Sequence, residues 1–386
     1  MALKRLSASN RRPSRGIPLI CPVRDELAFL PAFLRHHRKL GVASFVFIDN
    51  ESCDGTTEYL LAQPDCVVFH TADSYRAANY ATDWINQVVG KLNLEGWLLY
   101  LDVDEHLIYA DCETIGIEKF CESVGVAGFD CVNAAMIDMY PKDSFLELSL
   151  SPEQEMADVM GWFDVDYLFR EWPARPWDQR EGFLLQVLGG PRCRLLSNLD
   201  AEARHGAAFY TLANQVDRIV DRIPLGLMPL LAKLAPREMP AQHKRPINFV
   251  KPGFHYLNSH VGTNTHVARD LTALLHYKFC GELKRRFEMK VEGNHYRRGL
   301  SYRQLEDAIT ACPGSSLHYP GSRRFRSSAD LAAVGLIGPA VSQLWTDHAV
   351  RSVRTGASGP LAQRRQFSGR SARVGSVGRH EHSQHT

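Results

Sequence analysis

Short apolar runs alternate with longer amphipathic stretches along the first third of the chain. The apolar runs have the length and the β-branched and aromatic content typical of buried strands, and they cover residues 17–23, 44–48, 66–70, 97–101 and 131–137. Between them, apolar residues recur at intervals of three and four, which predicts helices over 26–40, 56–62, 77–92 and near 114–123. This alternation predicts an α/β fold with a mostly parallel sheet and helices on both faces. In such sheets, ligands bind beyond the carboxyl ends of the strands.

The pattern after residue 140 is less regular. Aromatic, proline and glycine residues interrupt 140–210, which is typical of long loops and short strands, and a further helix is predicted over 269–286. The chain therefore divides into a basic, disordered N-terminus (1–15), an α/β half (16–140), an irregular region (141–325) and a loosely ordered to disordered basic tail (326–386).

The small net charge of +2 hides an uneven distribution. Residues 1–15 contain five basic and no acidic residues, and 351–386 contain seven arginines and one glutamate. The body, 16–350, keeps 33 basic and 42 acidic residues, a net charge of −9. The basic ends are short and lack interleaved aromatic residues, which argues against nucleic-acid binding. Peripheral contact with an anionic membrane surface through these ends is left open.

The nine cysteines are scattered and form no C-x-x-C pair. This distribution favours free thiols in a reducing compartment, so the expected location is the cytoplasm, with the inner face of the membrane as an alternative. No apolar segment of signal-peptide type follows the basic start, and no run reaches the roughly 18 apolar residues that a spanning helix needs.

Carboxylates gather at the end of the fourth predicted strand. The segment WLLYLDVDEH (97–106) places Asp102, Asp104 and Glu105 after an apolar run, where buried charge is costly unless a positive group compensates it. Two aspartates separated by one residue project to the same side of an extended chain, so both can address one Mg²⁺ or Mn²⁺ that also takes phosphate oxygens. A solvated acidic turn is the alternative interpretation.

A second polar cluster follows the second predicted strand. Asp49 and Asn50 lie at the same sheet edge as Asp102, and their donors and acceptors suit a nucleobase or ribose. Asp54 and Thr56, slightly further on, have the character of a helix N-cap and turn.

Taken together and in order, these segments resemble a known family. CPVRDE (21–26), LGV (40–42), FVFIDNESCDGT (45–56) and WLLYLDVDEHL (97–107) resemble glycosyltransferases of the family 2 type with the GT-A fold, in a subgroup with a D-x-D-E motif. The resemblance covers about residues 17–140. It implies a UDP-linked nucleotide-sugar donor, a divalent cation at the D-x-D motif, and inverting transfer of the sugar to a hydroxyl of a glycan or lipid-linked acceptor, in surface polysaccharide or glycoconjugate synthesis. It makes 16–140 the nucleotide-sugar-binding half and 141–325 the acceptor-side part.

The resemblance also implies site residues. Those for the nucleotide-sugar are Pro22, Val23, Arg24, Glu26, Asp49, Asn50, Arg76, Asn79 and Asp102. Those for the Mn²⁺ or Mg²⁺ ion are Asp102, Asp104 and, from a later segment LLHYKF (274–279), His276. Commoner members have two acidic residues in place of Asp49 and Asn50. For His276, the alternative is a histidine on a helix packing face.

The catalytic base is less clearly marked. The Glu-Asp pair common in the family is missing, and Asp164 and Asp166 in GWFDVDYLF are the candidates, Asp164 first, because a carboxylate among aromatic residues can have a raised pKa. A plain loop or strand edge is equally compatible with this segment. Further on, GGPRCR (189–194) resembles an acceptor-side segment whose arginines could meet an anionic group.

Two other functions are compatible with these features. The missing pair favours a nucleotide-binding or scaffold protein of the same fold with weak catalysis. A nucleotidyltransferase is a third interpretation, but it would be expected to carry a glycine-rich basic loop after the first strand, where this chain has CPVRDE. The sequence gives no indication of the oligomeric state.

Overall fold

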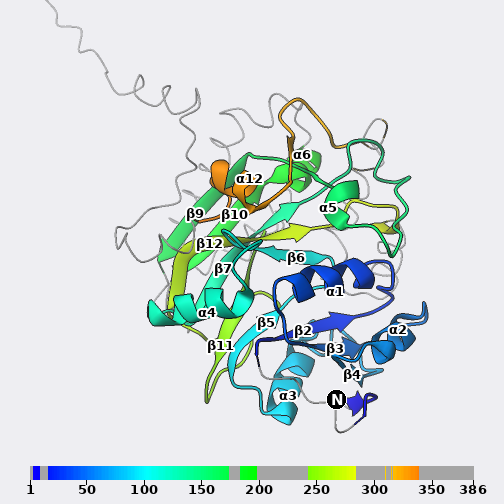
Figure 1. Cartoon of the computed structure of the whole chain (residues 1–386), viewed down its shortest axis with the longest axis vertical. Helices are drawn as coiled ribbons and strands as arrows, with labels where there is room; N and C mark the ends of the chain where they lie inside the picture. The colour runs from blue at the N-terminus through cyan, green and yellow to red at the C-terminus, as the bar shows by residue number, and fades with distance from the viewer. Residues whose placement is uncertain are drawn as a thin grey trace, which may run out of the picture. The chain divides into compact units, whose positions relative to one another are not determined.

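A computed structural model describes residues 3–8, 16–173, 183–197, 242–283, 309, 314 and 316–338, and all structural statements below concern these residues. They form a mixed α/β fold around one large sheet (Figure 1). Among them, no helix is both long and apolar enough to cross a bilayer.

The large sheet has nine strands in the order β1-β4-β3-β2-β5-β11-β7-β12-β6. Their bounds are Lys4–Arg5 (β1), Pro18–Val23 (β2), Ser44–Asp49 (β3), Cys66–His70 (β4), Gly96–Tyr100 (β5), Glu105–Ile108 (β6), Cys131–Asp138 (β7), His243–Val250 (β11) and Val267–His276 (β12). Strands β4, β3, β2, β5, β7 and β12 run in one direction, and β1, β11 and β6 run in the opposite direction. The predicted α/β class with a mostly parallel sheet is confirmed.

Helices cover both faces of this sheet, as predicted. On one face lie α1 (Leu30–Lys39), α2 (Thr56–Ala62) and α4 (Ile117–Val126), and on the other lies α3 (Thr82–Leu92). Successive side chains of a strand point to opposite faces of the sheet. In β3, Phe47 packs in the same cluster as Phe33 of α1, whereas Val46 packs with Trp84 of α3. Both faces of the parallel strands are therefore buried, which explains why these strands read as continuous apolar runs.

The predicted helix over 77–92 starts later than expected, at Thr82. The reason is local: Asn79, Tyr80 and Ala81 have φ angles of 50°, 55° and 67°. A right-handed helix requires negative φ, so it cannot pass through three left-handed residues. Arg76 and Asn79 thus lie in a turn that leads into α3, and both are exposed.

The helix predicted over 269–286 is wrong. Residues 267–276 form strand β12, which lies between β7 and β6 in the sheet. Every residue from 271 to 280 is buried. A run that is apolar on all sides shows no period of two, and periodicity alone cannot distinguish it from a buried helix.

The two ends of the described chain are also more ordered than expected. In the N-terminus expected to be disordered, Lys4–Arg5 form β1, which pairs with β4. In the tail, α12 (Ser328–Ala333) begins with a capping box formed by Ser327 and Asp330, and its Leu331 is fully buried. The remaining tail residues, 339–386, lie outside the described part.

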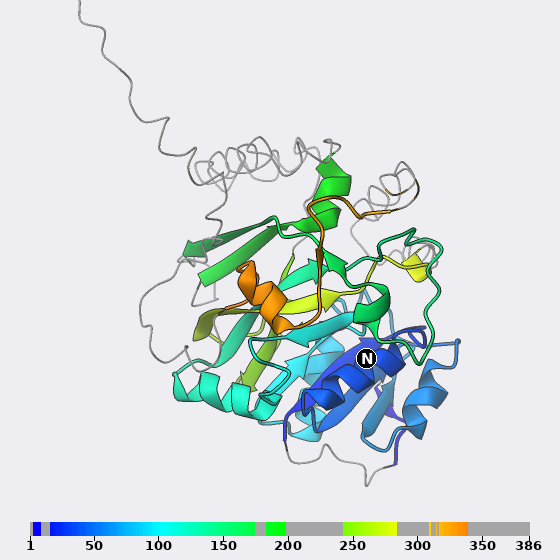
Figure 2. The same ribbon diagram turned by 45° about the horizontal axis from the view of Figure 1, so that its top comes forward.

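Regular structure extends into the irregular region as well. It consists of α5 (Met156–Val159), the pairs β8 (Trp162–Phe163) with β13 (Arg323–Arg324) and β9 (Tyr167–Pro173) with β10 (Phe183–Gly189), and α6 (Gly190–Ser197). Figure 2 shows the green β9–β10 pair and, at its end, α6. Residues 198–241 lie outside the described residues.

Three histidines pack together where α1 meets β6; His37 and His106 are buried, and His36 is half-buried. The ring of His36 stacks on that of His106, with centroids 4.5 Å apart, and contacts that of His37 at 4.8 Å. A His36 Nε2 hydrogen bond to the Leu107 carbonyl, 2.9 Å long, joins the helix to the strand. Burial lowers the pKa of all three rings, that of His36 to about 4, although the Leu107 carbonyl acts in the opposite direction on His36.

This cluster predicts a loss of stability in mild acid. In the unfolded chain the His36 pKa returns to about 6.5, so the unfolded state binds the proton first and stability falls as the pH drops from about 6.5 toward 4. At pH 5, His36 alone is expected to lower the free energy of unfolding by about 2 kcal/mol relative to pH 7. Urea unfolding at the two pH values measures this. His36→Gln should reduce the pH dependence, and the exposed control His255→Gln should keep all of it; equal slopes for both variants would contradict the prediction.

Candidate functional site

The carboxyl ends of the parallel strands bring together residues that are far apart in the sequence. Val23 at the end of β2 pairs with Asp49 at the end of β3. Asp102 lies two residues beyond the end of β5, and His276 at the end of β12 pairs with Asp138 at the end of β7. This is the edge at which α/β sheets bind ligands, and Val23, Asp49, Asp102 and His276 of the predicted residues lie there.

Asp104 and His276 face each other at this edge. His276 Nε2 lies 3.6 Å from Asp104 Oδ2, and the two side chains are only 9% and 12% exposed, the histidine being the less exposed. The backbone joins them as well, because the Tyr277 N–H donates to the Asp104 carbonyl oxygen at 2.8 Å. Two segments 172 positions apart in the sequence numbering therefore place a carboxylate and an imidazole at one point.

The orientation of the His276 ring is set by Asp138. Nδ1 lies 2.7 Å from Asp138 Oδ1, and since an ionised carboxylate can only accept, Nδ1 carries the hydrogen and Nε2 keeps its lone pair. Burial lowers the pKa of His276 although Asp104 and Asp138 act to raise it, which favours the neutral ring. A neutral imidazole fixed through its second nitrogen is the form that binds metal ions.

Asp138 is held in its turn by Arg192. Arg192 Nε donates to Asp138 Oδ2 at 2.6 Å, and Gln242 Nε2 lies 3.4 Å from the same oxygen. Although burial raises the pKa of Asp138, Arg192 and His276 outweigh it and bring the pKa down to about 2. The carboxylate therefore stays ionised behind His276.

Arg192 reaches Asp138 because the chain turns sharply at two glycines. Gly189 and Gly190 have φ angles of 152° and 67°, and they lie against Tyr167. A Cβ on Gly190 would come within 2.4 Å of the Tyr167 hydroxyl oxygen. The arginines of GGPRCR, predicted to meet an anionic group, are thus bound to carboxylates of the chain itself: Arg192 to Asp138 and Arg194 to Asp164.

The acidic motif has an internal positive partner that the sequence did not reveal. Lys244 of β11 lies with its Nζ 2.7 Å from Glu105 Oε2 and 3.2 Å from Asp102 Oδ2. Burial acts to lower the Lys244 pKa, but the two carboxylates outweigh it and raise the pKa. Glu105 also accepts the Asp102 backbone N–H at 2.9 Å and so shapes the turn of the motif. The positive charge that was expected from a metal ion is therefore supplied in part by a lysine.

The loops after β2 and β3 are tied together by hydrogen bonds. Asp25 accepts the Cys53 N–H at 2.7 Å, and Asp54 accepts the N–H groups of Leu27 and Thr56, each at 3.0 Å. The predicted turn role of Asp54 agrees with these contacts. The two loops thus form one rim beside the ends of β2 and β3.

Asp49 and Asn50 are buried in this rim. Asp49 accepts the Ser52 N–H at 3.3 Å, and the Asn50 amide donates to the carbonyl oxygens of Thr71 and Asp73. Asn50 thus holds the loop that follows β4. Of the other predicted nucleotide residues, Arg24, Arg76 and Asn79 are exposed, Val23 is buried, and Pro22 and Glu26 are half-buried. Their binding roles stay predictions.

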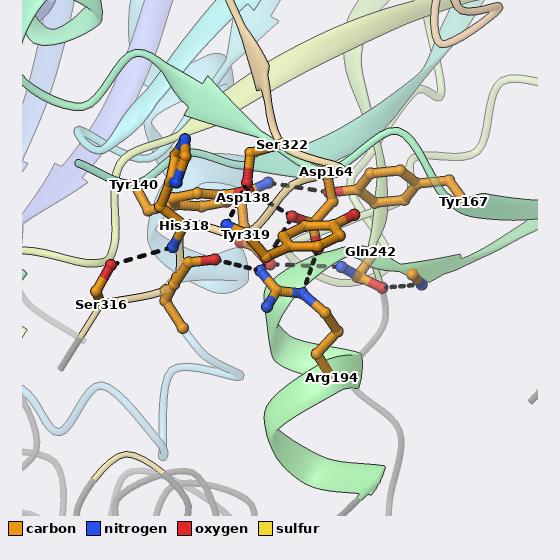
Figure 3. A network of polar contacts seen from close by, with 12 residues as sticks. Asp138, Tyr140, Asp164, Tyr167, Arg194, Gln242, Ser316, His318, Tyr319 and Ser322 are labelled. Atoms are coloured by element: carbon orange, nitrogen blue, oxygen red, sulfur yellow. Dashed lines mark hydrogen bonds and ion pairs between the residues drawn. The ribbon is translucent and has the colours of Figure 1, made fainter. Parts of the chain in front are cut away.

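Asp164 lies deeper than the sequence suggested. It is fully buried and receives two hydrogen bonds from Arg194 of α6, at 2.7 and 3.0 Å, and one from the Tyr140 hydroxyl at 2.5 Å (Figure 3). The Tyr140 hydroxyl also shares a hydrogen bond with Ser322 at 2.9 Å, which joins this network to the C-terminal segment. Asp164 is therefore part of a buried ion pair, and its role as a catalytic base stays a prediction.

Asp138 and Lys244 are the two residues at this site that sequence reasoning missed. Asp138 had a detectable signal, because it ends a predicted apolar strand in the same way as Asp102 does. Lys244 had a weaker signal, a pair of basic residues at the start of the segment KRPINFV (244–250). Nothing local identified the carboxylates that these side chains would meet.

Among the described residues, no group of three or more histidine, cysteine, aspartate or glutamate side chains is arranged to hold a metal ion. Asp104 and His276 offer one carboxylate oxygen and one imidazole nitrogen. That donor set fits Mn²⁺ or Mg²⁺ only if phosphate oxygens and water supply the remaining ligands, which is the usual arrangement for Mg²⁺ at nucleotide sites.

Comparison with known proteins adds little to this geometry. No known family model matches the chain, and no curated protein matches it. Among solved structures, a UDP-glucose pyrophosphorylase from Acinetobacter baumanii is similar over 75% of this chain and 98% of its own, at 10% identity and a TM-score of 0.25. With so low a TM-score, the match says nothing about activity.

Proposed function

We propose that this protein is a metal-dependent glycosyltransferase of the family 2 type with the GT-A fold. It would move a sugar from a UDP-linked donor to a hydroxyl of a glycan or lipid-linked acceptor, with inversion, in surface polysaccharide or glycoconjugate synthesis. The observation that carries the proposal is the pair Asp104 and His276, 3.6 Å apart at the carboxyl ends of the strands, with Asp138 fixing the imidazole. Three of the segments that carry the family resemblance, CPVRDE, FVFIDNESCDGT and WLLYLDVDEHL, contain the ends of β2, β3 and β5 at this same edge of the sheet.

In this proposal, each residue has a distinct task. Asp104 and His276 would hold Mn²⁺ or Mg²⁺, which when bound supplies positive charge for the leaving diphosphate. Asp138 keeps the His276 lone pair directed at that position. The rim formed by the loops after β2 and β3 would hold the nucleoside, with Asp49 and Arg24 as candidate contacts. The acceptor proton would go to Asp164, whose ion pair with Arg194 would first have to open.

Titration calorimetry of UDP with and without Mn²⁺ tests the proposal. Wild-type protein is expected to bind UDP at least about tenfold more tightly with Mn²⁺, because the diphosphate and the two side chains share the cation. Asp104→Asn and His276→Gln should each remove most of that gain, and Asp143→Asn, an exposed carboxylate elsewhere, should leave it intact. The proposal is refuted if the wild-type protein binds UDP equally tightly with and without Mn²⁺ and both site variants bind UDP as tightly as the wild type.

One observation favours an alternative, a nucleotide-binding or scaffold protein of the same fold with weak catalysis. The candidate base is engaged in a buried ion pair, in which both of its oxygens accept hydrogen bonds from Arg194. Release of UDP from a panel of UDP-sugars in the presence of Mn²⁺ decides between the two, since the alternative predicts binding with little or no turnover. We also propose that the protein acts in the cytoplasm, at the inner face of the membrane, and that its basic ends contact the membrane surface. Of these ends, residues 339–386 lie outside the described part.

A further inference from the structure

Lys244 is a deeply enclosed charge at the candidate site. Its side chain is 2% exposed, and Nζ is shared between Glu105, itself 1% exposed, and Asp102, whose side chain is 44% exposed. The ammonium group also lies 4.5 Å from the centre of the Tyr100 ring, a cation–π distance. Three separate contacts thus fix a positive charge directly behind the D-x-D motif.

The position of Lys244 in the sheet is specified by its strand. β11 runs antiparallel between β5 and β7, and its pairing with β7 shifts between Lys244 and Ile247, at the position of Pro246. Proline has no N–H for the ladder, and such an irregularity redirects the side chains beside it. On its other side β11 pairs with β5, where Ile247 lies opposite Leu99; this register brings Lys244 level with the residues that follow β5.

This contact gives the two aspartates of the motif different surroundings. Asp102 has one oxygen on Lys244, whereas Asp104 faces His276. Because Lys244 is enclosed, it cannot bind a diphosphate itself; it acts only on the charge and position of Asp102 and Glu105. A divalent cation bound to Asp102 would lie close to the Lys244 ammonium group, and the two positive charges would repel each other.

We propose that Lys244 is a built-in counter-ion that keeps Asp102 from binding the metal, so that Asp104 and His276 are the protein ligands and the cation binds firmly only together with a diphosphate. This inference rests on the proposed function and goes beyond it. It makes Lys244 a positioning residue, and it predicts an order of binding: the protein alone holds Mn²⁺ weakly, and the negative charge of the nucleotide completes the site.

The test is a titration of the full chain with Mn²⁺ alone, followed by electron paramagnetic resonance of the free ion. Lys244→Met removes the charge and keeps most of the length of the side chain, and it is expected to tighten Mn²⁺ binding at least about tenfold by releasing Asp102. Adding Asp102→Asn to Lys244→Met should abolish the gain, because the released carboxylate is the cause. A merely structural role of Lys244 would not produce this pattern.

Lys251→Met is the matched control. It removes a lysine beyond the other end of β11 that also forms a 2.7 Å pair with a carboxylate, that of Asp130, and it should leave Mn²⁺ binding unchanged. Should Lys244→Met fold poorly, Lys244→Met combined with Glu105→Gln leaves no unpaired buried charge and still releases Asp102, so it should also tighten Mn²⁺ binding.

Unchanged or weaker Mn²⁺ binding in a folded Lys244 variant would overturn the inference. So would a gain that persists after Asp102→Asn. This outcome can be distinguished from failure of the proposed function, because the Mn²⁺ titrations contain no nucleotide. If UDP fails to bind to the wild type and to every variant, the glycosyltransferase proposal is refuted. The effect of Lys244 on Mn²⁺ binding is still measured in that case.

Discussion

Replacing Asp164 by asparagine is expected to lower the free energy of unfolding by about 3–5 kcal/mol. The amide would keep the shape of the side chain but not its charge, so Arg194, whose side chain is 7% exposed, would be left as an uncompensated buried cation. The Tyr140 hydroxyl would also lose its ionised acceptor. Urea unfolding followed by circular dichroism measures the change.

The same variant distinguishes the two roles considered for Asp164. If its main task is the ion pair, Asp164→Asn loses stability, and combining it with Arg194→Met should restore part of the loss because no unpaired charge remains. If instead Asp164 is a base that leaves the pair readily, the variant keeps its stability and loses only turnover. Asp143→Asn, at an exposed position, should change the free energy of unfolding by no more than about 0.5 kcal/mol.

Replacing Asp138 by asparagine is expected to affect both folding and metal binding. The loss of charge leaves Arg192 buried beside a neutral group, which costs about 3–5 kcal/mol of stability. It also removes the ionised acceptor for His276 Nδ1, and loss of such an outer partner typically weakens metal binding by about 10–100-fold. Unfolding in urea measures the first effect, and Mn²⁺ titration of the folded variant measures the second.

A control isolates the second effect from the first. Arg192→Met combined with Asp138→Asn leaves no unpaired buried charge, so stability should partly recover, but His276 still lacks its carboxylate and Mn²⁺ binding should stay weak. Recovery of Mn²⁺ binding together with stability would show that Asp138 acts only through folding. Lys251→Met, which breaks a pair with a half-exposed lysine, should cost no more than about 1 kcal/mol.

The fold could be predicted where each face of a strand is buried by a separate helix. The runs that became β2, β3, β4, β5 and β7 are bounded by amphipathic stretches, so their type and their order along the chain were clear. β6 and β11 were not predicted, because β6 has four residues directly after an acidic motif and β11 contains two basic residues and a proline. β12 was assigned to the wrong class because it is buried on both faces of the sheet, which hides any alternation.

The candidate site, like the fold, could be predicted only in part. Asp104 and His276 carry motif signals, and the structure brings them together, while their metal-binding role stays a prediction. Lys244 and Asp138 act through partners that only the lateral order of strands places beside them: Lys244 lies on a strand next to β5, and Asp138 pairs with His276. Lateral order depends on which strand inserts between which others, and no local pattern of residues encodes it.

The short strand β1 has a consequence for the solution behaviour of the protein. β4 would otherwise be an edge of the large sheet, with a row of unpaired N–H and C=O groups of the kind that adds strands from other chains. Lys4 and Arg5 occupy part of that row, and the Ser7 hydroxyl accepts the Val68 N–H at 3.2 Å. Two residues form an edge too short to recruit another strand, and both are cationic. The basic N-terminus therefore covers part of the β4 edge of the sheet, a structural role independent of any membrane or ligand.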